Sequence, residues 1–294
     1  MKKVGFVTVY GRANAGKSTI INKCLGYKLL PVSSKPQTTR DNVKAIYNDE
    51  DSQIIFVDTP GVFKPHGKLG SILLRDAESA KEGVDCIVYV IDASEVPNFE
   101  LCQKLQNAEV PIIIAYNKVD LVKANVGEER LARYVSLLPK AKVVRMSAKD
   151  NFGIDILLSE IKDTLQEGYP FYGLDMATDR PKEYIISEIV REKCMRLLSA
   201  EVPHSIAIDI KSVDYDDEEN VMSVYGNIIV EKQSEKAIVI GKKGAMISEI
   251  TRYSSQSMAS FFGCKVDLNL VVKVIPDWRN DERYLKKFGY DESL

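Results

Sequence analysis

The sequence predicts an α/β domain with a mostly parallel sheet and helices on both faces, followed by a smaller α+β domain. Three observations support this. Apolar runs of strand length alternate with helical runs over the first 168 residues, and a break rich in Gly and Pro follows. The remaining residues show helix, strand, strand, helix, helix and strand patterns in that order. The chain has 294 residues, 45% of them hydrophobic, which is enough for two separate cores.

The first predicted strand, Val4–Val9, leads into Gly11-Arg-Ala-Asn-Ala-Gly-Lys-Ser-Thr19, and a helix is expected over Thr19–Leu25. The spacing G-x-x-x-x-G-K-S between a strand and a helix is typical of a phosphate-binding P-loop, although a plain glycine turn is the alternative. Lys17 would reach the β- and γ-phosphates, and the Ser18 hydroxyl would ligate Mg²⁺. The predicted phosphate-binding residues are Gly11, Arg12, Ala13, Asn14, Ala15, Gly16, Lys17, Ser18 and Thr19.

Residues 27–42 lack apolar periodicity and are expected to form a loop that ends in Pro36-Gln-Thr-Thr-Arg-Asp41. A threonine here can close over Mg²⁺ and the γ-phosphate, which orders the loop only when that phosphate is present. An ordinary surface loop is the alternative interpretation. Beside a P-loop, the functional interpretation is favoured.

A hairpin is expected from strands over 43–47 and 53–57, and its second strand ends in Asp58-Thr-Pro-Gly61. Asp58 can hold Mg²⁺ through water, and the Gly61 N–H can donate to the γ-phosphate. A helix N-cap is the alternative role for Asp58. The following loop, 62–68, contains His66, which is expected to be solvated. The predicted nucleotide contacts in this region are Asp58, Thr59, Pro60, Gly61 and Val62.

Strands are next expected over 86–91 and 112–115, with an amphipathic helix over 98–108 between them. The second strand leads into Asn117, Lys118, Val119 and Asp120, which are predicted to contact the base. A carboxylate only accepts hydrogen bonds, so Asp120 would pair with the two adjacent donors of guanine and would face an acceptor on adenine. Asn117 would brace the base and the P-loop, and the Lys118 stem would cover the base.

The last strand of this half, 143–146, ends in Ser147-Ala-Lys149, and a helix is expected over 153–165. A backbone N–H in this segment, contributed by Ser147 or Ala148, could donate to guanine O6. Each motif therefore follows the carboxyl end of a strand, where open α/β sheets bind ligands. Together the motifs predict a guanine-nucleotide hydrolase.

The second half begins after a linker, so that the expected domains are 1–168 and 182–294, joined by 169–181. Helices are expected over 182–198, 235–240 and 245–261. Strands are expected over 205–213, 222–231 and 265–274, with an acidic turn at 214–220. Gly241-Lys-Lys-Gly244 separates the last two helices, in the layout of a type II KH domain. This predicts a fold that binds single-stranded RNA.

The G-x-x-G turn would let an RNA backbone approach closely, because glycine has no side chain. Gly241, Lys242, Lys243 and Gly244 are the predicted RNA contacts, with the two lysines facing phosphates. A helix-capping turn is the alternative. Residues 169–294 carry 17 Lys and Arg against 21 Asp and Glu, so overall charge does not favour nucleic acid. Trp278 and His204 are expected to be structural.

These motifs resemble the Era family of GTPases over almost the whole chain. The resemblance lies in Lys35-Pro-Gln-Thr-Thr-Arg40, Glu201-Val-Pro-His-Ser205, Val239–Ile247 and Val274-Ile-Pro-Asp-Trp-Arg279. It implies that Thr39 contacts Mg²⁺ and that Lys17, Thr39 and Gly61 are the catalytic residues. Departures include Ala13, where the family usually has proline, and Ala15, where it often has valine. Asp41-Asn42 also replaces a commoner His-Arg pair.

The resemblance further implies slow intrinsic hydrolysis, because Val62 stands where Ras-like proteins have a glutamine that orients water. Asn14 matches an asparagine that helps to bind K⁺ in potassium-dependent relatives, so K⁺ stimulation is a hypothesis. The implied partner is the 3′ end of 16S ribosomal RNA during maturation of the small (30S) subunit. Two alternatives come from other classes: a metabolic kinase, and an RNA-binding scaffold whose nucleotide site is regulatory.

The charge balance and the cysteine content indicate the cellular compartment in which the protein is expected. Lys and Arg number 40 against 42 Asp and Glu, and the five cysteines are scattered without metal-ligand spacing. The chain is expected to be a cytoplasmic monomer with reduced thiols, without a membrane span or signal peptide. Peripheral contact with the inner face of the cell membrane stays an open expectation that no segment supports.

Overall fold

The fold was analysed in a computed structural model that describes residues 1–33, 35, 43–58, 68–69, 71–72 and 83–290. Its contacts divide the chain into two compact units. The first contains residues 1–30, 39–63 and 73–179, and the second contains 31–38, 64–72 and 180–294. Each unit is described by itself.

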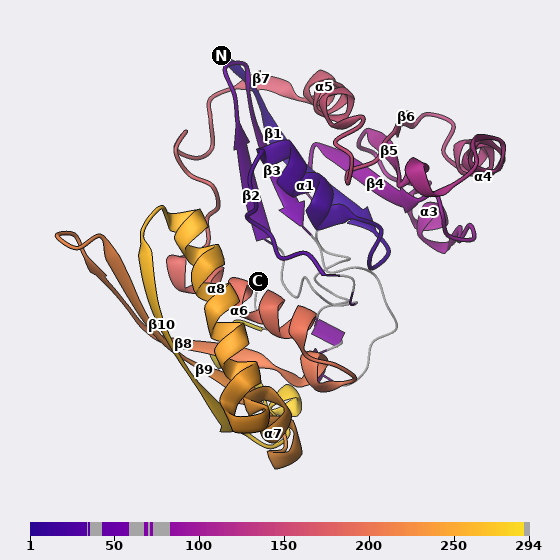
Figure 1. The fold of residues 1–294 in the computed structure, drawn as a ribbon. Helices are drawn as coiled ribbons and strands as arrows, with labels where there is room; N and C mark the ends of the chain where they lie inside the picture. Colours follow the sequence, from indigo (N-terminus) through magenta and orange to yellow (C-terminus); the bar gives the residue numbers. More distant parts are fainter. Residues whose placement is uncertain (34, 36–42, 59–67, 70, 73–82, 291–294) are drawn as a thin grey trace. The chain divides into compact units, whose positions relative to one another are not determined.

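Among the described residues, the first unit is built on a seven-stranded sheet of order β2-β3-β1-β4-β5-β6, with β7 paired to the start of β1 (Figure 1). β2 is antiparallel to β3 and β7 is antiparallel to β1, whereas the other neighbours are parallel. This confirms the predicted mostly parallel sheet. The strands are β1 (Lys2–Gly11), β2 (Val43–Asn48), β3 (Ser52–Asp58), β4 (Cys86–Asp92), β5 (Ile112–Asn117), β6 (Lys142–Arg145) and β7 (Gln166–Gly168).

Helices cover both faces of this sheet. Alternate residues of β1 and β4, including Tyr10 and Tyr89, share one core cluster with Leu101 and Leu131. That cluster holds α3 and α4, while α1 and α5 contact each other and pack on the other face. The described helices are α1 (Lys17–Leu25), α3 (Glu100–Leu105), α4 (Ala124–Leu137) and α5 (Ile154–Thr164), with a 3₁₀ turn η1 at Val119–Leu121.

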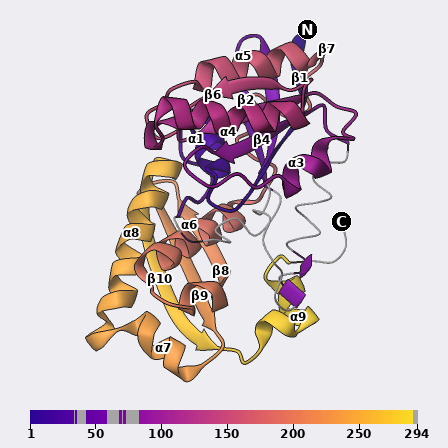
Figure 2. The same ribbon diagram turned by 90° about the vertical axis from the view of Figure 1, so that its right-hand side faces the viewer.

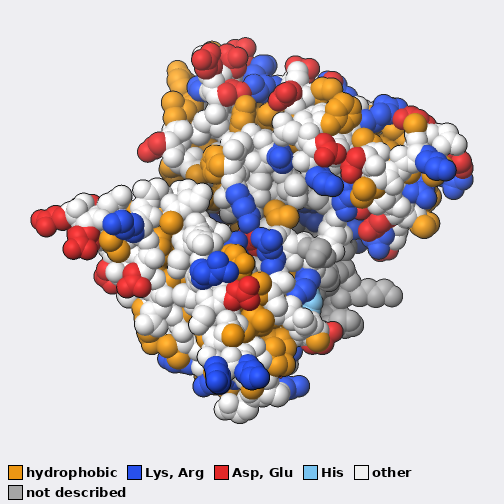
Figure 3. Space-filling model, in the orientation of Figure 1, with side chains coloured by type: hydrophobic (Ala, Val, Ile, Leu, Met, Phe, Trp, Pro, Cys, Tyr) orange, Lys and Arg blue, Asp and Glu red, His pale blue; other side chains and the backbone are white. Residues whose placement is uncertain are grey.

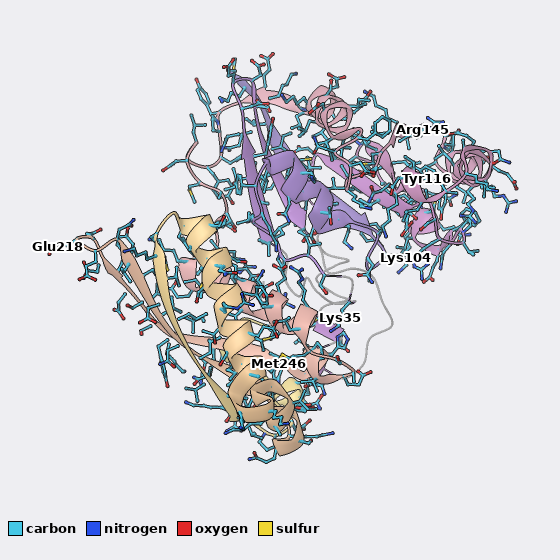
Figure 4. The ribbon with its side chains drawn as sticks, viewed as in Figure 1. Lys35, Lys104, Tyr116, Arg145, Glu218 and Met246 are labelled. Carbon is cyan, nitrogen blue, oxygen red and sulfur yellow. The ribbon has the colours of Figure 1, made fainter. Side chains whose placement is uncertain are left out.

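α4 and β7 were not predicted from the sequence, and α3 is shorter than the helix predicted over 98–108. α4 buries Gly127, Leu131 and Tyr134, and side chains of β5 and β6 hold it to the sheet. The Tyr116 hydroxyl donates to Gly127 O at 2.9 Å, and Arg145 pairs with Glu128 at 2.6 Å (Figure 4). β7 is three residues long, too short to produce a periodic signal.

The linker after β7 follows the first unit. Gln53 of β3 is fully buried, and its Oε1 accepts from the N–H groups of Phe171 and Tyr172 at 2.7 and 3.0 Å. Its Nε2 donates to Tyr172 O at 2.9 Å. Further along, Ile46 N donates to Ala177 O at 2.9 Å. The linker is therefore hydrogen-bonded to β3 and β2 instead of hanging free.

The second unit contains a three-stranded sheet, of order β10-β9-β8, within the part of the chain that is described. β8 and β9 are antiparallel, and β9 and β10 are parallel. α6 and α8 cover one face of this sheet, as Figure 2 shows. Its elements are α6 (Lys182–Leu197), η2 (Val202–Ser205), β8 (Ala207–Asp216), β9 (Val221–Val230), α7 (Gln233–Ile240), η3 (Lys242–Gly244), α8 (Ala245–Phe262), β10 (Lys265–Val274), η4 (Trp278–Asn280) and α9 (Glu282–Lys287).

The predicted order of elements in the second unit is confirmed, with two corrections. β8 continues to Asp216, so the acidic turn is narrower than expected because its first residues still pair with β9. The short helix α9 was not anticipated. Trp278 is fully buried, its Nε1 donates to Ser205 O at 2.8 Å, and its ring packs against Phe288. The structural role expected for Trp278 is therefore confirmed.

All five cysteines lie in the described part of the chain, where they are free and buried. Burial raises the pKa of the Cys24 and Cys194 thiols to about 12. It also raises the pKa of the Cys86 thiol to about 11. Among the described helices, none combines the length and apolarity needed to cross a membrane.

Candidate nucleotide site and RNA-binding turn

The P-loop lies between β1 and α1, as predicted, and it needs its second glycine. Gly16 has φ of 106°, and a Cβ on it would lie 2.3 Å from Asn117 Nδ2. Lys17 is 6% exposed, and its Nζ donates to Gly11 O and Arg12 O at 3.2 and 3.0 Å. Burial lowers the pKa of Lys17 to about 8, an effect opposed by the Asp58 carboxylate. The loop thus holds a buried amine that is mostly charged at neutral pH, and a bound anion would raise its pKa again.

Two of the predicted Mg²⁺ ligands are in contact. Ser18 Oγ donates to Asp58 Oδ2 at 2.7 Å, and the Asp58 carboxylate is fully buried at the end of β3. A hydroxyl and a carboxylate are hard oxygen donors of the kind that Mg²⁺ prefers. The two side chains therefore fit a magnesium ion beside the P-loop.

Asn117 connects three segments of the site. Its Nδ2 donates to Ala15 O of the P-loop at 2.9 Å, and its Oδ1 accepts from Ala148 N at 3.0 Å. The side chain is only 2% exposed. The P-loop, the end of β5 and the loop after β6 are thereby fixed together, which is the bracing role that the sequence analysis predicted for the P-loop side.

Lys118 and Asp120 lie at the same edge of the sheet. Lys118 has a left-handed conformation, with φ of 63°, and its Nζ donates to Asn14 O at 2.8 Å. Asp120 lies in η1 with an exposed side chain. This exposed carboxylate can accept hydrogen bonds from a ligand, and recognition of a base requires such an acceptor.

The loop after β6 differs in detail from the prediction. The N–H groups of Ser147 and Ala148 already donate, to Phe152 O and to Asn117 Oδ1. Within the described part of the chain, the Lys149 N–H has no acceptor. Lys149 is therefore a further candidate donor to a base carbonyl, which the sequence analysis did not single out.

Several predicted site residues fall outside the described residues. They are Thr39, Thr59, Pro60, Gly61 and Val62. Of the predicted loop over 62–68, only Lys68 is described. Its Nζ lies 2.7 Å from Glu282 Oε1, and it groups with the second unit.

The G-x-x-G turn of the second unit joins α7 to α8. Gly241 has φ of 73°, and a Cβ there would lie 2.7 Å from Met246 Cβ and 2.8 Å from Met246 N. A Cβ on Gly244 would meet nothing within 4 Å, although φ is 80°. Lys242 and Lys243 are exposed. The turn therefore presents open backbone and two cations on one short segment.

The negative balance of the second half is concentrated elsewhere. Five of its 21 acidic residues lie at the tip of the β8–β9 hairpin (Figure 3). Figure 4 places Glu218 at this tip, well away from Met246 at the start of α8. The overall charge of the unit therefore does not describe the surroundings of the G-x-x-G turn. The exposed acidic residues of the hairpin are Asp214, Asp216, Asp217, Glu218 and Glu219.

Comparisons with known proteins match both halves of the chain. A family profile described as 50S ribosome-binding GTPase matches residues 6–118, and one described as KH domain matches residues 201–279. "GTPase Era" from Clostridium kluyveri is 39% identical over 293 residues, which cover 99% of this chain and 100% of the relative. The chain belongs to the Era family of GTPases. The Clostridium tetani protein of the same name is 39% identical over 294 residues, which cover 99% of each chain.

Solved Era structures have the same fold as the described chain. An Aquifex aeolicus Era variant bound to GDP and AlF₄⁻ has a TM-score of 0.93 and 37% identity, covering 98% of this chain and 99% of that one. Era in complex with MgGDPNP and nucleotides 1506–1542 of 16S ribosomal RNA also has a TM-score of 0.93, with 36% identity. That match covers 99% of this chain and 100% of the other. GTP hydrolysis and the combination of a P-loop GTPase domain with a KH domain are thereby confirmed.

Asp92, the last residue of β4, was not predicted as a site residue of this Era-family chain. Its carboxylate lies 2.5 Å from Lys118 Nζ. The signal was present, because Asp92 ends a fully buried strand at the same edge of the sheet as the other motifs. Arg12 of the P-loop also pairs with Glu95, at 3.0 Å, although both side chains are largely exposed.

Proposed function

We propose that this Era-family GTPase couples GTP binding and hydrolysis to the binding of the 3′ end of 16S ribosomal RNA during maturation of the small ribosomal subunit. The observation that carries the proposal is the presence of both sites on one chain. The P-loop, Asn117 and Asp120 form one, and the open G-x-x-G turn forms the other. Era bound to nucleotides 1506–1542 of 16S ribosomal RNA supports the choice of RNA.

The phosphate side of the reaction is assigned to Lys17, Ser18 and Asp58. Lys17 would place an ammonium on the β- and γ-phosphates, while Ser18 and Thr39 would hold Mg²⁺ directly and Asp58 would hold it through water. When bound, Mg²⁺ neutralises charge that develops on the phosphate oxygens. Val62 cannot orient water by hydrogen bonding, so the intrinsic rate is slow. The assigned catalytic residues are Lys17, Thr39 and Gly61, with the remaining P-loop residues, Thr59 and Pro60 around the phosphates.

The base side is assigned to Asp120, with Asn117, Lys118, Val119 and the loop after Ser147 around it. An Asp120→Asn variant should lose GTP and gain xanthosine triphosphate, because xanthine has an acceptor where guanine has its amino group. Filter binding of both nucleotides to the wild type and the variant measures this. Unchanged GTP affinity in the variant would contradict the assignment.

The RNA side is assigned to Gly241, Lys242, Lys243 and Gly244. Gly244→Asp adds a carboxylate where phosphates are expected, and there is open space for its side chain. RNA affinity should fall at least tenfold while GTP hydrolysis without RNA persists. Gly241→Ala is not a suitable substitute, because its Cβ would strike the backbone of Met246. Crosslinking followed by sequencing of the bound fragment identifies the RNA, and a fragment from elsewhere would refute the 16S assignment.

We propose that K⁺ stimulates hydrolysis through Asn14. Support comes from its position in the P-loop, where it has a left-handed conformation with φ of 63°. GTP turnover should be faster in KCl than in NaCl at equal ionic strength. An Asn14→Ala variant should lose the difference. Equal turnover of the wild type in both salts would remove the idea.

The domain bounds, the cellular location and the oligomeric state are also proposed. The domains are proposed as 1–168 and 182–294, with a linker over 169–181, supported by two compact units in the contacts. A reducing, cytoplasmic location is supported by the five free, buried cysteines. The protein is proposed to act as a monomer on the small subunit, and its contact with the membrane surface rests on no described residue.

A further inference from the structure

A carboxylate outside the recognised GTPase motifs contacts the nucleotide site. Asp92 ends β4 and is 9% exposed. One oxygen, Oδ1, accepts from Ser94 N and Ser94 Oγ at 2.9 and 2.6 Å. The other, Oδ2, accepts from Lys118 Nζ at 2.5 Å. Ser94, in the turn that follows β4, thus fixes one oxygen of the carboxylate, and the other oxygen fixes the Lys118 amino group.

Lys118 is fixed at its amino group by two partners from different elements. Besides Asp92, its Nζ donates to Asn14 O of the P-loop. A lysine side chain that moves freely in the unbound protein would lose about 2 kcal/mol of rotamer freedom when a ligand orders it. Ordering the lysine in advance removes that cost from nucleotide binding.

The surroundings connect the Asp92 turn to the base site. Ala93 N donates to Asn117 O at 2.9 Å, so a backbone hydrogen bond links this turn to Asn117, the residue before Lys118. Arg130 donates to Ala93 O at 2.8 Å, which fixes the turn from α4. Burial would raise the pKa of Asp92, but the hydrogen bonds from Lys118 and Ser94 hold it below its ordinary value. The carboxylate is therefore charged when it meets the lysine.

We propose that Asp92 is a positioning residue for the guanine nucleotide, which acts by holding the Lys118 side chain in place across the base site. This rests on the proposed assignment of Asn117–Asp120 to the guanine base. Asp92 contributes to affinity for both GDP and GTP and does not choose the base, because Asp120 is the exposed carboxylate. Its effect therefore falls on nucleotide dissociation and on KM more than on kcat.

The test compares GDP dissociation from the wild type, Asp92→Asn, Lys118→Met and the double variant. In Asp92→Asn the amide oxygen still accepts from Ser94, while the charge opposite Lys118 is lost. GDP affinity of this variant should fall about tenfold, with the preference for GDP over ADP and XDP retained. Because Asp92 acts through Lys118, the double variant should bind GDP no more weakly than Lys118→Met alone.

Asp85→Asn is the matched control. It removes a carboxylate from the residue just before β4, where Asp85 Oδ2 accepts from Phe6 N at 2.8 Å. Its GDP affinity should match that of the wild type. Thermal unfolding without nucleotide shows whether each variant folds. Should Asp92→Asn not fold, Asp92→Glu, which keeps the charge on a longer side chain, replaces it in the cycle and should show a smaller loss.

Two results would overturn the proposal. One is GDP affinity of Asp92→Asn within twofold of the wild type. The other is a loss in the double variant equal to the product of the single losses, since that would make Asp92 and Lys118 independent. If instead the wild type bound ADP as tightly as GDP, the guanine assignment itself would fail. The two failures are therefore distinguishable.

Discussion

At the scale of single residues, Lys17 makes nucleotide binding depend on pH. Its pKa is lowered from 10.5 to about 8 by burial. Between these values the unfolded chain binds a proton that the folded chain does not, so unfolding free energy rises with pH in this window. A bound polyphosphate favours the charged amine and raises the pKa. Above pH 8, nucleotide binding should therefore take up a proton.

The expected result is about fourfold weaker GDP binding at pH 8.5 than at pH 7, with uptake of about three-quarters of a proton at pH 8.5. Titration calorimetry in two buffers of different ionisation heat measures the uptake. This window lies below the ionisation of guanine N1–H. The Lys17→Ala variant should bind GDP weakly, and its GDP affinity should not change with pH in this range. Proton release, or no pH dependence in the wild type, would show that the Lys17 amine is charged before the ligand arrives.

Gly16 illustrates how one missing side chain supports the site. Gly16→Ala would bring a Cβ to 2.3 Å from Asn117 Nδ2 and disrupt its hydrogen bond to Ala15. We expect a loss of about 2–4 kcal/mol of unfolding free energy, from backbone strain and the broken bond together. GDP affinity should also fall, as measured by fluorescence titration.

Gly26→Ala is the control for Gly16, since Gly26 also has a positive φ, of 79°, but a Cβ there meets nothing within 4 Å. Urea unfolding should show only the strain of about 1–2 kcal/mol for this variant. Equal losses in both variants would mean that contact with Asn117 is not the reason for glycine at position 16.

At the scale of elements, the linker over 169–181 is hydrogen-bonded to β2 and β3 at one edge of the first sheet. Gln53→Leu would leave the N–H groups of Phe171 and Tyr172 without their acceptor and remove a buried amide. We expect about 1–3 kcal/mol of destabilisation for each backbone group that stays buried without a partner. Chymotrypsin, which cleaves after aromatic residues, should then cut the linker faster.

The matched variant is Gln103→Leu, which replaces an exposed glutamine of α3. Its unfolding free energy should stay within about 0.5 kcal/mol of the wild type. Its linker should resist chymotrypsin as the wild type does. Slow cleavage of Gln53→Leu would indicate that the backbone pairing of Ile46 with Ala177 suffices to hold the linker.

The same elements show what sequence reasoning can and cannot reach. Motifs at strand ends were predictable because the carboxyl ends of parallel strands meet at one edge, which places Lys17, Asp58 and Asn117 together. The bracing of the P-loop by Asn117 followed from its chemistry. β7 was not predictable because its pairing with β1 is set by tertiary structure. Asp92 was missed because it belongs to no motif of fixed spacing, although its place at the carboxyl end of a buried strand was a signal.

At the scale of the whole molecule, the two halves are predicted to communicate. We propose that GTP orders residues 27–41 and 62–68, that their order changes how the KH domain presents its G-x-x-G turn to RNA, and that hydrolysis reverses the change. Lys68, at the end of the second segment, pairs with Glu282 inside the second unit, and an exposed pair of this kind contributes less than about 1 kcal/mol. The effect must therefore be spread over many contacts.

RNA affinity should accordingly differ at least fivefold between the states with a GTP analogue and with GDP. Fluorescence anisotropy with a labelled 16S 3′ fragment measures this. By reciprocity, the RNA should raise the affinity for the nucleotide that favours RNA binding by the same factor. RNA affinity that is identical with GTP analogue, with GDP and without nucleotide would show that the two sites act independently.

The inaccessible native thiols offer a direct way to watch such motion. Because all five natural sulfhydryls are buried, maleimide dyes should react selectively with cysteines introduced on the surface. Lys104→Cys in the first unit and Glu218→Cys in the second, both labelled in Figure 4, would carry a donor and an acceptor. Energy transfer between them would follow a single molecule through one cycle of turnover, with the wild-type thiols left in place.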